Sequence, residues 1–173
     1  MNSLKQALRT IPDFPKPGIQ FQDIAPLLQD PIHFSNTIQA LKTHHQNDGI
    51  DLIAGIESRG FIFASALAYA LGCGTVLIRK PGKLPGPTHQ QSYDLEYGTD
   101  ALEIQTDAFQ PHQRILLMDD VLATGGTVSA AHQLIHSHFD VQLVGATFLL
   151  EITSLKGRNL LTNLPIHSLI QLP

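Results

Sequence analysis

The stretch ILLMDDVLATGGTVSA, from Ile115 to Ala130, decides the fold. Its first four residues are apolar and predict a buried strand, and an amphipathic pattern from about Thr127 predicts a helix. Between them lie two adjacent carboxylates, Asp119 and Asp120, and a run of small residues. The sequence therefore predicts a strand-to-helix turn of the kind that binds ligands at the carboxyl end of a parallel sheet.

The small residues of this turn favour an anion. Gly125 and Gly126 allow main-chain N–H groups to approach a ligand closely, and Thr124 and Thr127 add hydroxyl donors beside Ala123. The helix that follows contributes the positive end of its dipole. We therefore predict that residues 123–127 bind a phosphate group.

The two carboxylates need a different partner on the same ligand, because they would repel the phosphate itself. Ribose hydroxyls and a hydrated Mg2+ ion suit Asp119 and Asp120. The turn lacks the Gly-Lys-Ser/Thr ending of a nucleoside-triphosphate loop and the spacing of a dinucleotide fingerprint. The pattern thus indicates a sugar phosphate that carries Mg2+.

Strand and helix patterns alternate along the rest of the chain. Asp30 and Pro31 predict the start of a helix that places Phe34, Ile38 and Leu41 on one face. Further strands are predicted at 51–55, 75–79, 102–105 and 141–150, and further helices at 61–71 and 127–138. This order predicts an α/β fold: a largely parallel twisted sheet flanked by helices, in a single domain spanning residues 1–173.

Composition narrows the function. Hydrophobic residues make up 43% and charged residues 15% of the 173 residues, which predicts a globular chain that does not enter a membrane. The net charge of -4 gives no general attraction to nucleic acid. Cys73 is the only cysteine, and the first residues lack a secretory signal, so we expect a cytoplasmic protein.

Two further segments carry residues suited to a pyrophosphate. The turn AGIESRGFIFA places Arg59 at a second strand-to-helix junction, where it can form paired hydrogen bonds to phosphate oxygens or a plain surface ion pair. The segment from Arg79 to Gly98 contains many turn-forming residues and carries Arg79, Lys80 and Lys83. It predicts either a lid that excludes water from the site or a solvated basic loop.

The apolar strand, the Asp-Asp pair and the Ala-Thr-Gly-Gly-Thr turn together resemble the phosphoribosyl-pyrophosphate (PRPP) motif of the type I phosphoribosyltransferases. The segments IPDFPKPGIQFQDIAPLL and LEITSLKGR resemble the adenine-using branch of that family, and the similarity extends from about Ile11 to Gln171. The resemblance implies transfer of the 5-phosphoribosyl group from PRPP to adenine, which gives AMP and pyrophosphate. It also implies that Mg2+ is held through PRPP, with Asp119 and Asp120 contacting the ion through water.

Site residues follow from the resemblance by position. It implies that Glu57, Ser58 and Arg59 bind pyrophosphate with Arg79, Lys80 and Lys83, and that the Glu57–Ser58 peptide is cis. It also implies that Phe21 and Ile152 enclose adenine while the main chain at Gln20 and Gln22 reads the base edge, although the family often has arginine at position 22. Glu96 would manage the purine's proton, with Tyr97 beside it in the lid.

The resemblance further implies a homodimer, because Arg79 in this family reaches the neighbouring subunit. Residues 1–30 would form a small hood over the base, and residues 80–98 a flexible lid loop. Two alternatives remain open: a hypoxanthine or guanine phosphoribosyltransferase, and a PRPP-binding regulator without catalysis. The negative net charge and the retained Glu96 favour an enzyme.

The histidines have a simpler interpretation. His132 and His136 have helical i, i+4 spacing, but no HExxH pattern or cysteine supports a metal site there. We expect these two residues and His138 to lie on a solvated helix face. The same surface role is expected for His44, His45 and His89.

Overall fold

The computed structural model describes residues 2–94 and 99–173 of the chain. The elements in chain order are α1 (Asn2–Gln6), β1 (Arg9–Pro12), β2 (Gln20–Asp23), α2 (Ala25–Gln29), α3 (Pro31–His45), β3 (Leu52–Ile56), α4 (Gly60–Leu71), β4 (Gly74–Ile78), β5 (Thr88–Asp94), β6 (Thr99–Gln105), β7 (Arg114–Leu122), α5 (Gly126–His138), β8 (Gln142–Ile152), two 3-10 turns η1 (Thr153–Leu155) and η2 (Gly157–Leu160), and β9 (Ile166–Leu172).

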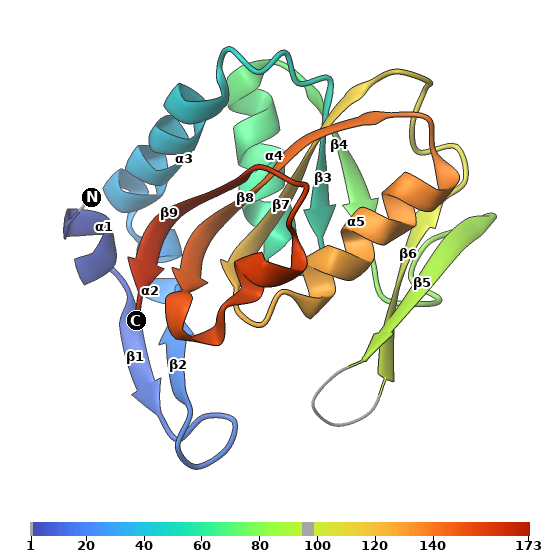
Figure 1. The fold of residues 1–173 in the computed structure, drawn as a ribbon. Coiled ribbons are helices and arrows are strands. Elements are labelled where there is room, and N and C mark those ends of the chain that lie inside the picture. Colours follow the sequence, from blue (N-terminus) through green and yellow to red (C-terminus); the bar gives the residue numbers. More distant parts are fainter. Residues whose placement is uncertain (1, 95–98) are drawn as a thin grey trace.

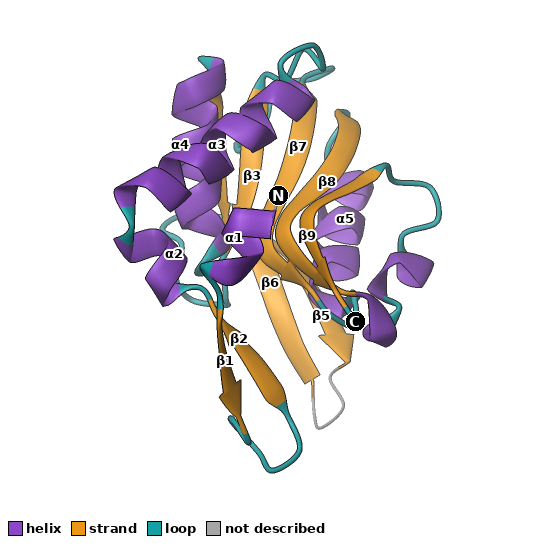
Figure 2. Ribbon diagram, turned by 90° about the vertical axis from the view of Figure 1, so that its left-hand side faces the viewer, coloured by secondary structure: helices purple, strands orange, loops and turns teal. Residues whose placement is uncertain are grey.

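The centre of the molecule is a parallel five-stranded sheet in the order β4-β3-β7-β8-β9. Helices α3 and α4 cover one face and α5 covers the other (Figure 2). Strands of a sheet covered on both faces are apolar throughout, which is why β3 reads LIAGI. The predicted fold class is confirmed.

Two hydrophobic clusters lie on the two faces of this sheet, and β7 contributes to both. Ile115 and Leu117 pack in the cluster that includes Leu134 of α5. Leu116 and Met118 pack in the other cluster, beside Phe63 of α4. Successive residues of a strand point to opposite faces, so the continuous apolar run of β7 supplies both cores.

The predicted helices form for the expected local reasons. Asp30 precedes α3, and its carboxylate accepts hydrogen bonds from the main-chain N–H groups of Ile32 and His33 at 2.8 and 2.9 Å. Helix α4 ends at Gly72, which adopts a left-handed φ of 76°. The predicted boundaries of both helices lie within a residue or two of these positions.

Two predictions about strands are wrong. Strand β7 does not end before the aspartates: it continues to Leu122, because its main-chain pairing with β8 extends through Val121 and Leu122. Residues 88–94, expected within a long loop, form β5, which pairs antiparallel with β6. Hairpins β1–β2 and β5–β6 both project beyond the end of the sheet to which the parallel strands point (Figure 1).

The expectation that His45 is solvated is also wrong. Its side chain is only 5% exposed, because α3 packs its last turn against the sheet next to β9. His44 is exposed but stacks on His167, with 3.6 Å between ring centroids. His136 and His138 are exposed and His132 is half-buried. Within the described residues, the structure contains no helix of the length and apolarity needed to cross a membrane.

Candidate active site

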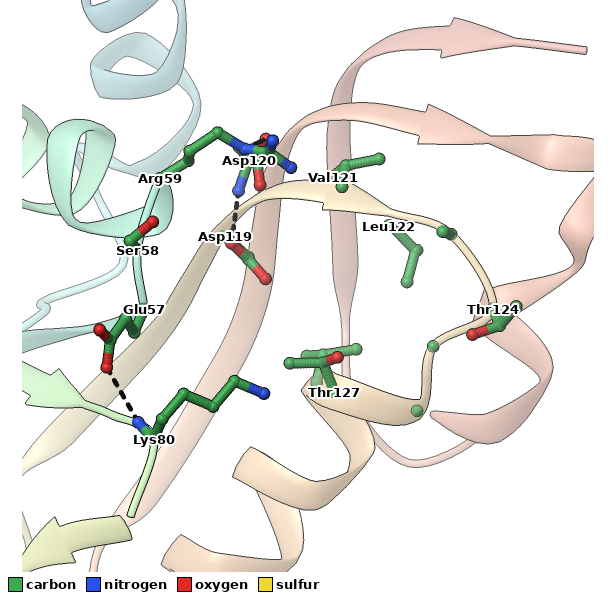
Figure 3. Close-up of a pocket in the computed structure, with 14 residues that line it drawn as sticks. Glu57, Ser58, Arg59, Lys80, Asp119, Asp120, Val121, Leu122, Thr124 and Thr127 are labelled. Atoms are coloured by element: carbon green, nitrogen blue, oxygen red, sulfur yellow. Dashed lines mark hydrogen bonds and ion pairs between the residues drawn. The ribbon is translucent and has the colours of Figure 1, made fainter. Parts of the chain in front are cut away.

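The two predicted anion-binding turns meet because their strands are neighbours. Strands β3 and β7 pair in parallel, with Gly55 opposite Met118. The residues that follow Gly55 therefore lie next to the residues that follow Met118. They enclose a cavity of about 340 Å³. Its described lining consists of Glu57, Ser58, Arg59, Lys80 and residues 119–128 (Figure 3).

The turn after β7 has the features of a phosphate site. Gly125 adopts a left-handed φ of 88° directly before α5, and no described side chain caps this helix. The N–H groups of a helix's first turn have no partner within the helix, so they are available to an anion. All five predicted residues of the phosphate loop, 123–127, line the cavity.

A second main-chain segment supports this loop from behind. A Cβ atom added to Gly125 would lie 2.4 Å from the carbonyl oxygen of Gly157, and one added to Gly157 would lie 2.3 Å from that of Ala123. The two segments therefore touch main chain to main chain. The sequence analysis did not predict a role for Gly157, because a single glycine so distant in the chain from Ala123 and Gly125 carries no local signal.

Both aspartates line the cavity. Asp120 is buried, and its Oδ2 forms an ion pair with Nε of Arg59 at 2.6 Å. Oδ1 of Asp119 accepts a hydrogen bond from the main-chain N–H of Asp120 at 2.8 Å. Burial away from water raises the pKa of Asp119 well above its ordinary value, and the negative charge of the neighbouring Asp120 raises it further.

The turn after β3 agrees with one prediction and modifies another. The Glu57–Ser58 peptide is cis, as expected. The Glu57 carboxylate, however, accepts hydrogen bonds from the main-chain N–H of Lys80 at 2.9 Å and from Nε and Nη2 of Arg79, both at 3.2 Å. The Lys80 N–H and then Arg79 lower the pKa of Glu57, so this side chain holds the end of β4 as an anion.

Lys80 extends from the end of β4 toward Thr127 across the cavity (Figure 3). Its Nζ donates to the hydroxyl of Tyr93 at 2.9 Å and also pairs with Asp100. Hydrogen bonding to these two side chains raises the pKa of Lys80 despite its partial burial, which opposes the rise. Lys80 therefore stays protonated and lines the cavity, with its ammonium group paired to Asp100.

The basic loop after β4 is held by a residue that the sequence analysis missed. Glu103 of β6 is 5% exposed, and its carboxylate accepts the main-chain N–H groups of Lys83 and Leu84, each at 2.9 Å. Glu103 lies 20 residues along the chain from Lys83, so the sequence around either residue does not reveal this contact. Arg79 and Lys83 are not among the described residues that line the cavity.

None of the residues predicted to bind a base belongs to the described lining of the cavity. The guanidinium carbon of Arg59 lies 5.7 Å from the ring centroid of Phe21, and this contact links β2 to the site. Oε1 of Gln22 accepts a hydrogen bond from Thr10 at 3.3 Å, Gln20 is exposed, and Ile152 is half-buried at the end of β8. The predicted Glu96 and Tyr97 lie outside the described residues.

Comparisons with known proteins agree with this geometry. Residues 27–151 match the family model described as a phosphoribosyl transferase domain. The chain is 54% identical to an adenine phosphoribosyltransferase of Chloroflexus aurantiacus, over 97% of this chain and 96% of that protein.

Solved structures show the same likeness. An adenine phosphoribosyltransferase from Thermoanaerobacter pseudethanolicus superposes with a TM-score of 0.95 at 47% identity, over 99% of each chain. The enzyme of that name from Saccharomyces cerevisiae, in complex with an imino-altritol bisphosphate and adenine, superposes with a TM-score of 0.93 at 41% identity, over 97% of each chain.

Proposed function

The chain belongs to the phosphoribosyl transferase family, and from this membership we propose that it transfers the 5-phosphoribosyl group of PRPP to adenine, giving AMP and pyrophosphate. The relatives that carry the name adenine phosphoribosyltransferase cover almost the whole chain, which favours adenine over hypoxanthine or guanine and favours an enzyme over a regulator. The observation that carries the proposal is the cavity in which two anion-binding turns meet.

PRPP would bind in this cavity with one phosphate-bearing end on each turn. Its 5-phosphate would accept hydrogen bonds from the main chain of residues 123–127, and its ribose hydroxyls would donate to Asp119 and Asp120. The pyrophosphate would then lie near Ser58, Arg59 and Lys80, the cationic part of the lining. Lys83 and Arg79 would approach it from the loop after β4.

The acidic pair also fits Mg2+. Carboxylate oxygens are ligands that this ion prefers, and Arg59 supplies one positive charge beside two carboxylates. Asp119 and Asp120 would hold the ion through water while it is bound to PRPP. Bound Mg2+ would neutralise charge on the pyrophosphate leaving group.

In the reaction, N9 of adenine forms a bond to C1 of the ribose as the bond from C1 to the pyrophosphate oxygen breaks. Positive charge develops on the sugar, so the main contribution of these residues is to orient both reactants and stabilise the departing anion. Glu96 would accept the proton that the purine loses and return it in the reverse reaction.

Adenine would bind between Phe21 and Ile152. Phe21 supplies a flat apolar surface for stacking, and the main chain at Gln20 and Gln22 would read the base edge. A main-chain contact does not depend on the side chain at position 22, so the replacement of arginine by glutamine there preserves it. Residues 1–30, with the β1–β2 hairpin, would form the hood, and residues 80–98 with Tyr97 the lid of this single domain.

We also propose a homodimer in the cytoplasm. Ile62 and Tyr69 on α4 and Leu77 on the neighbouring β4 are 40%, 90% and 40% exposed, an apolar surface that a second copy would cover. Arg79 follows this strand and would lie near the partner subunit. The single cysteine supports a reducing compartment. Tyr69→Glu should give monomers on size-exclusion chromatography, and an unchanged dimer would refute this surface.

A comparison of three bases tests the activity. Adenine carries an amino donor where hypoxanthine and guanine carry an oxo acceptor, so one pocket cannot satisfy both. With PRPP and Mg2+ supplied, the protein should form AMP from adenine and use the other two bases at least about 100-fold more slowly. Equal rates with hypoxanthine would overturn the proposed specificity, and no product with any base would overturn the enzymatic assignment.

A further inference from the structure

Three histidines from distant segments gather outside the cavity. His44 and His45 end α3, and His167 is the second residue of β9. Each offers a ring nitrogen, and the three nitrogens lie within 4.8 Å of one another. The rings of His44 and His167 stack 3.6 Å apart, and the ring of His45 is nearly perpendicular to both.

His45 has a buried nitrogen available to a ligand. Its Nδ1 lies 2.7 Å from Oδ2 of Asp48, and since a carboxylate only accepts hydrogen bonds, Nδ1 carries the proton. The lone pair is therefore on Nε2, which is buried and has no hydrogen-bond partner among the described residues. A carboxylate that fixes one ring nitrogen while the other faces an ion is the usual arrangement of metal-binding histidines.

His167 is prepared in a similar way. Its Nδ1 lies 3.2 Å from the hydroxyl of the fully buried Thr147, which can accept a hydrogen bond from Nδ1 and so leave the lone pair on Nε2. Burial, with the nearby charges of His44, His45 and Arg158, lowers the pKa of His167 to about 4. Arg158 is itself paired with Glu151 through two contacts of 2.6 Å.

We propose that His44, His45 and His167 bind one divalent transition-metal ion of the zinc class, with Asp48 orienting His45. Imidazole nitrogens suit Zn2+, Cu2+ and Ni2+, whereas Mg2+ prefers oxygen ligands. The histidine site therefore differs in its ligand chemistry from the Mg2+ site proposed for the active site. None of its three residues belongs to the described lining of the cavity.

Binding requires a local adjustment that the structure permits. A tetrahedral Zn2+ ion with bonds of about 2.1 Å separates its ligands by about 3.4 Å. The distances between the three nitrogens, which are at most 4.8 Å, must therefore shorten by up to about 1.4 Å. The stacked rings of His44 and His167 must also turn, because the lone pairs of two nearly parallel rings lie in separate planes and cannot meet at one ion. His44 is exposed at the end of α3, so its side chain can change rotamer.

The proposed ion would join α3 to β9, the edge strand of the central sheet. Since the ligands come from both elements, the folded chain should bind Zn2+ much more tightly than the unfolded chain. The melting temperature should consequently rise with Zn2+ concentration. This stabilisation does not depend on the phosphoribosyl-transfer activity.

Direct titration tests the site. Tag-free, chelator-treated protein would be titrated with Zn2+ by calorimetry, with Co2+ absorption as a probe of tetrahedral geometry. We expect one Zn2+ per chain with a Kd of about 1 µM or lower. His44→Ala, which alters an exposed side chain, and His167→Gln should each raise the Kd at least about tenfold, and Asp48→Asn about 10- to 100-fold.

The matched control is the histidine pair on α5. His132 and His136 lie one turn apart, with ring centroids separated by 6.0 Å, so His132→Ala combined with His136→Ala removes a competing surface site. This double variant should bind Zn2+ like the wild type. A wild-type Kd weaker than about 100 µM, loss of binding in the α5 variant, or an unchanged Kd in His44→Ala would each overturn the proposal.

Discussion

Replacing Gly157 with alanine tests whether the segment behind the phosphate loop sets the position of that loop. The added Cβ atom would lie 2.3 Å from the carbonyl oxygen of Ala123 and 3.0 Å from the main-chain nitrogen of Gly125. Ordinary contact begins at 3.4 Å, so the two main-chain segments must separate by about 1.1 Å. Neither contact atom belongs to a side chain that can turn away.

A displacement of this size should impair the use of PRPP far more than the binding of adenine. Misplacing a binding group by about 1 Å costs about 100-fold in rate, so we expect kcat/KM for PRPP to fall by about 100-fold. The KM for adenine should change little, because the predicted base-binding residues lie on β2 and at the end of β8. Overpacking should also destabilise the fold by about 1–3 kcal/mol, or about 2–4 °C in melting temperature for each kcal/mol.

Initial rates would be measured with PRPP varied at saturating adenine, and then with adenine varied at saturating PRPP. The two series separate the effect on kcat/KM for PRPP from the effect on KM for adenine. Gly74→Ala is the control: its Cβ would meet only the end of the Leu52 side chain, at 2.7 Å, and that side chain can rotate. A lower melting temperature with kcat/KM for PRPP within about threefold of wild type would refute the reasoning, because the fold would then respond to Gly157 and the phosphate loop would not.

Three further changes address individual side chains. Glu96→Gln should lower kcat by about 100- to 10,000-fold while the Kd for PRPP stays constant, and a parental kcat would contradict the proton-transfer role. Because the pKa of Asp119 is raised, its protonated form persists to higher pH, so KM for PRPP should rise as pH falls through that pKa. Asp119→Asn should bind PRPP weakly at every pH, and a wild-type pH profile in this variant would refute the ribose contact. Glu103→Gln should weaken the bonds from Lys83 and Leu84 and speed proteolysis within residues 80–94; unchanged cleavage would count against its role in holding the loop.

The pH dependence of Glu103 has a definite sign. Burial raises its pKa, but the main-chain N–H groups of Leu84, Gly82 and Lys83 outweigh this effect, so its pKa in the folded chain is lowered. The stability that Glu103 contributes is therefore present above the pKa of an unfolded glutamate. It is lost as pH falls through the lower folded value.

Strands β3, β4, β7 and β8 of the central sheet were predictable because they carry their own signal, whereas β9 was not predicted. Apolar runs such as LIAGI and ILLM leave few alternatives to a buried strand, and the helices between them have helical spacing. Strand β5 reads THQQSYD and has no such signal. It forms because each of its residues pairs with β6, from Thr88 opposite Gln105 to Asp94 opposite Thr99, and pairing across a hairpin is not visible in either segment alone.

The candidate site was predictable where one turn contains the chemistry. The phosphate loop and the Glu57–Ser58 cis peptide each lie within a few residues of a recognisable motif. The pairing of Arg79 with Glu57 and the burial of His45 depend on the packing of segments distant in the chain. Sequence patterns report which groups are present, whereas contacts between distant segments decide which of those groups remain free to bind a ligand.

The distance between the two anion-binding turns depends on main-chain packing. A Cβ atom on Gly60, at the start of α4, would lie 2.8 Å from the carbonyl oxygen of Met118 and 3.0 Å from Oδ1 of Asp119. The first turn of α4 therefore lies directly on β7 at Met118 and Asp119, and Arg59, which precedes α4, lies within 2.6 Å of Asp120. A larger residue at position 60 would separate the pyrophosphate turn from the ribose carboxylates, even though every side chain proposed to touch PRPP would remain. The proposed binding of both phosphate-bearing ends of PRPP therefore depends on the small size of glycine at position 60.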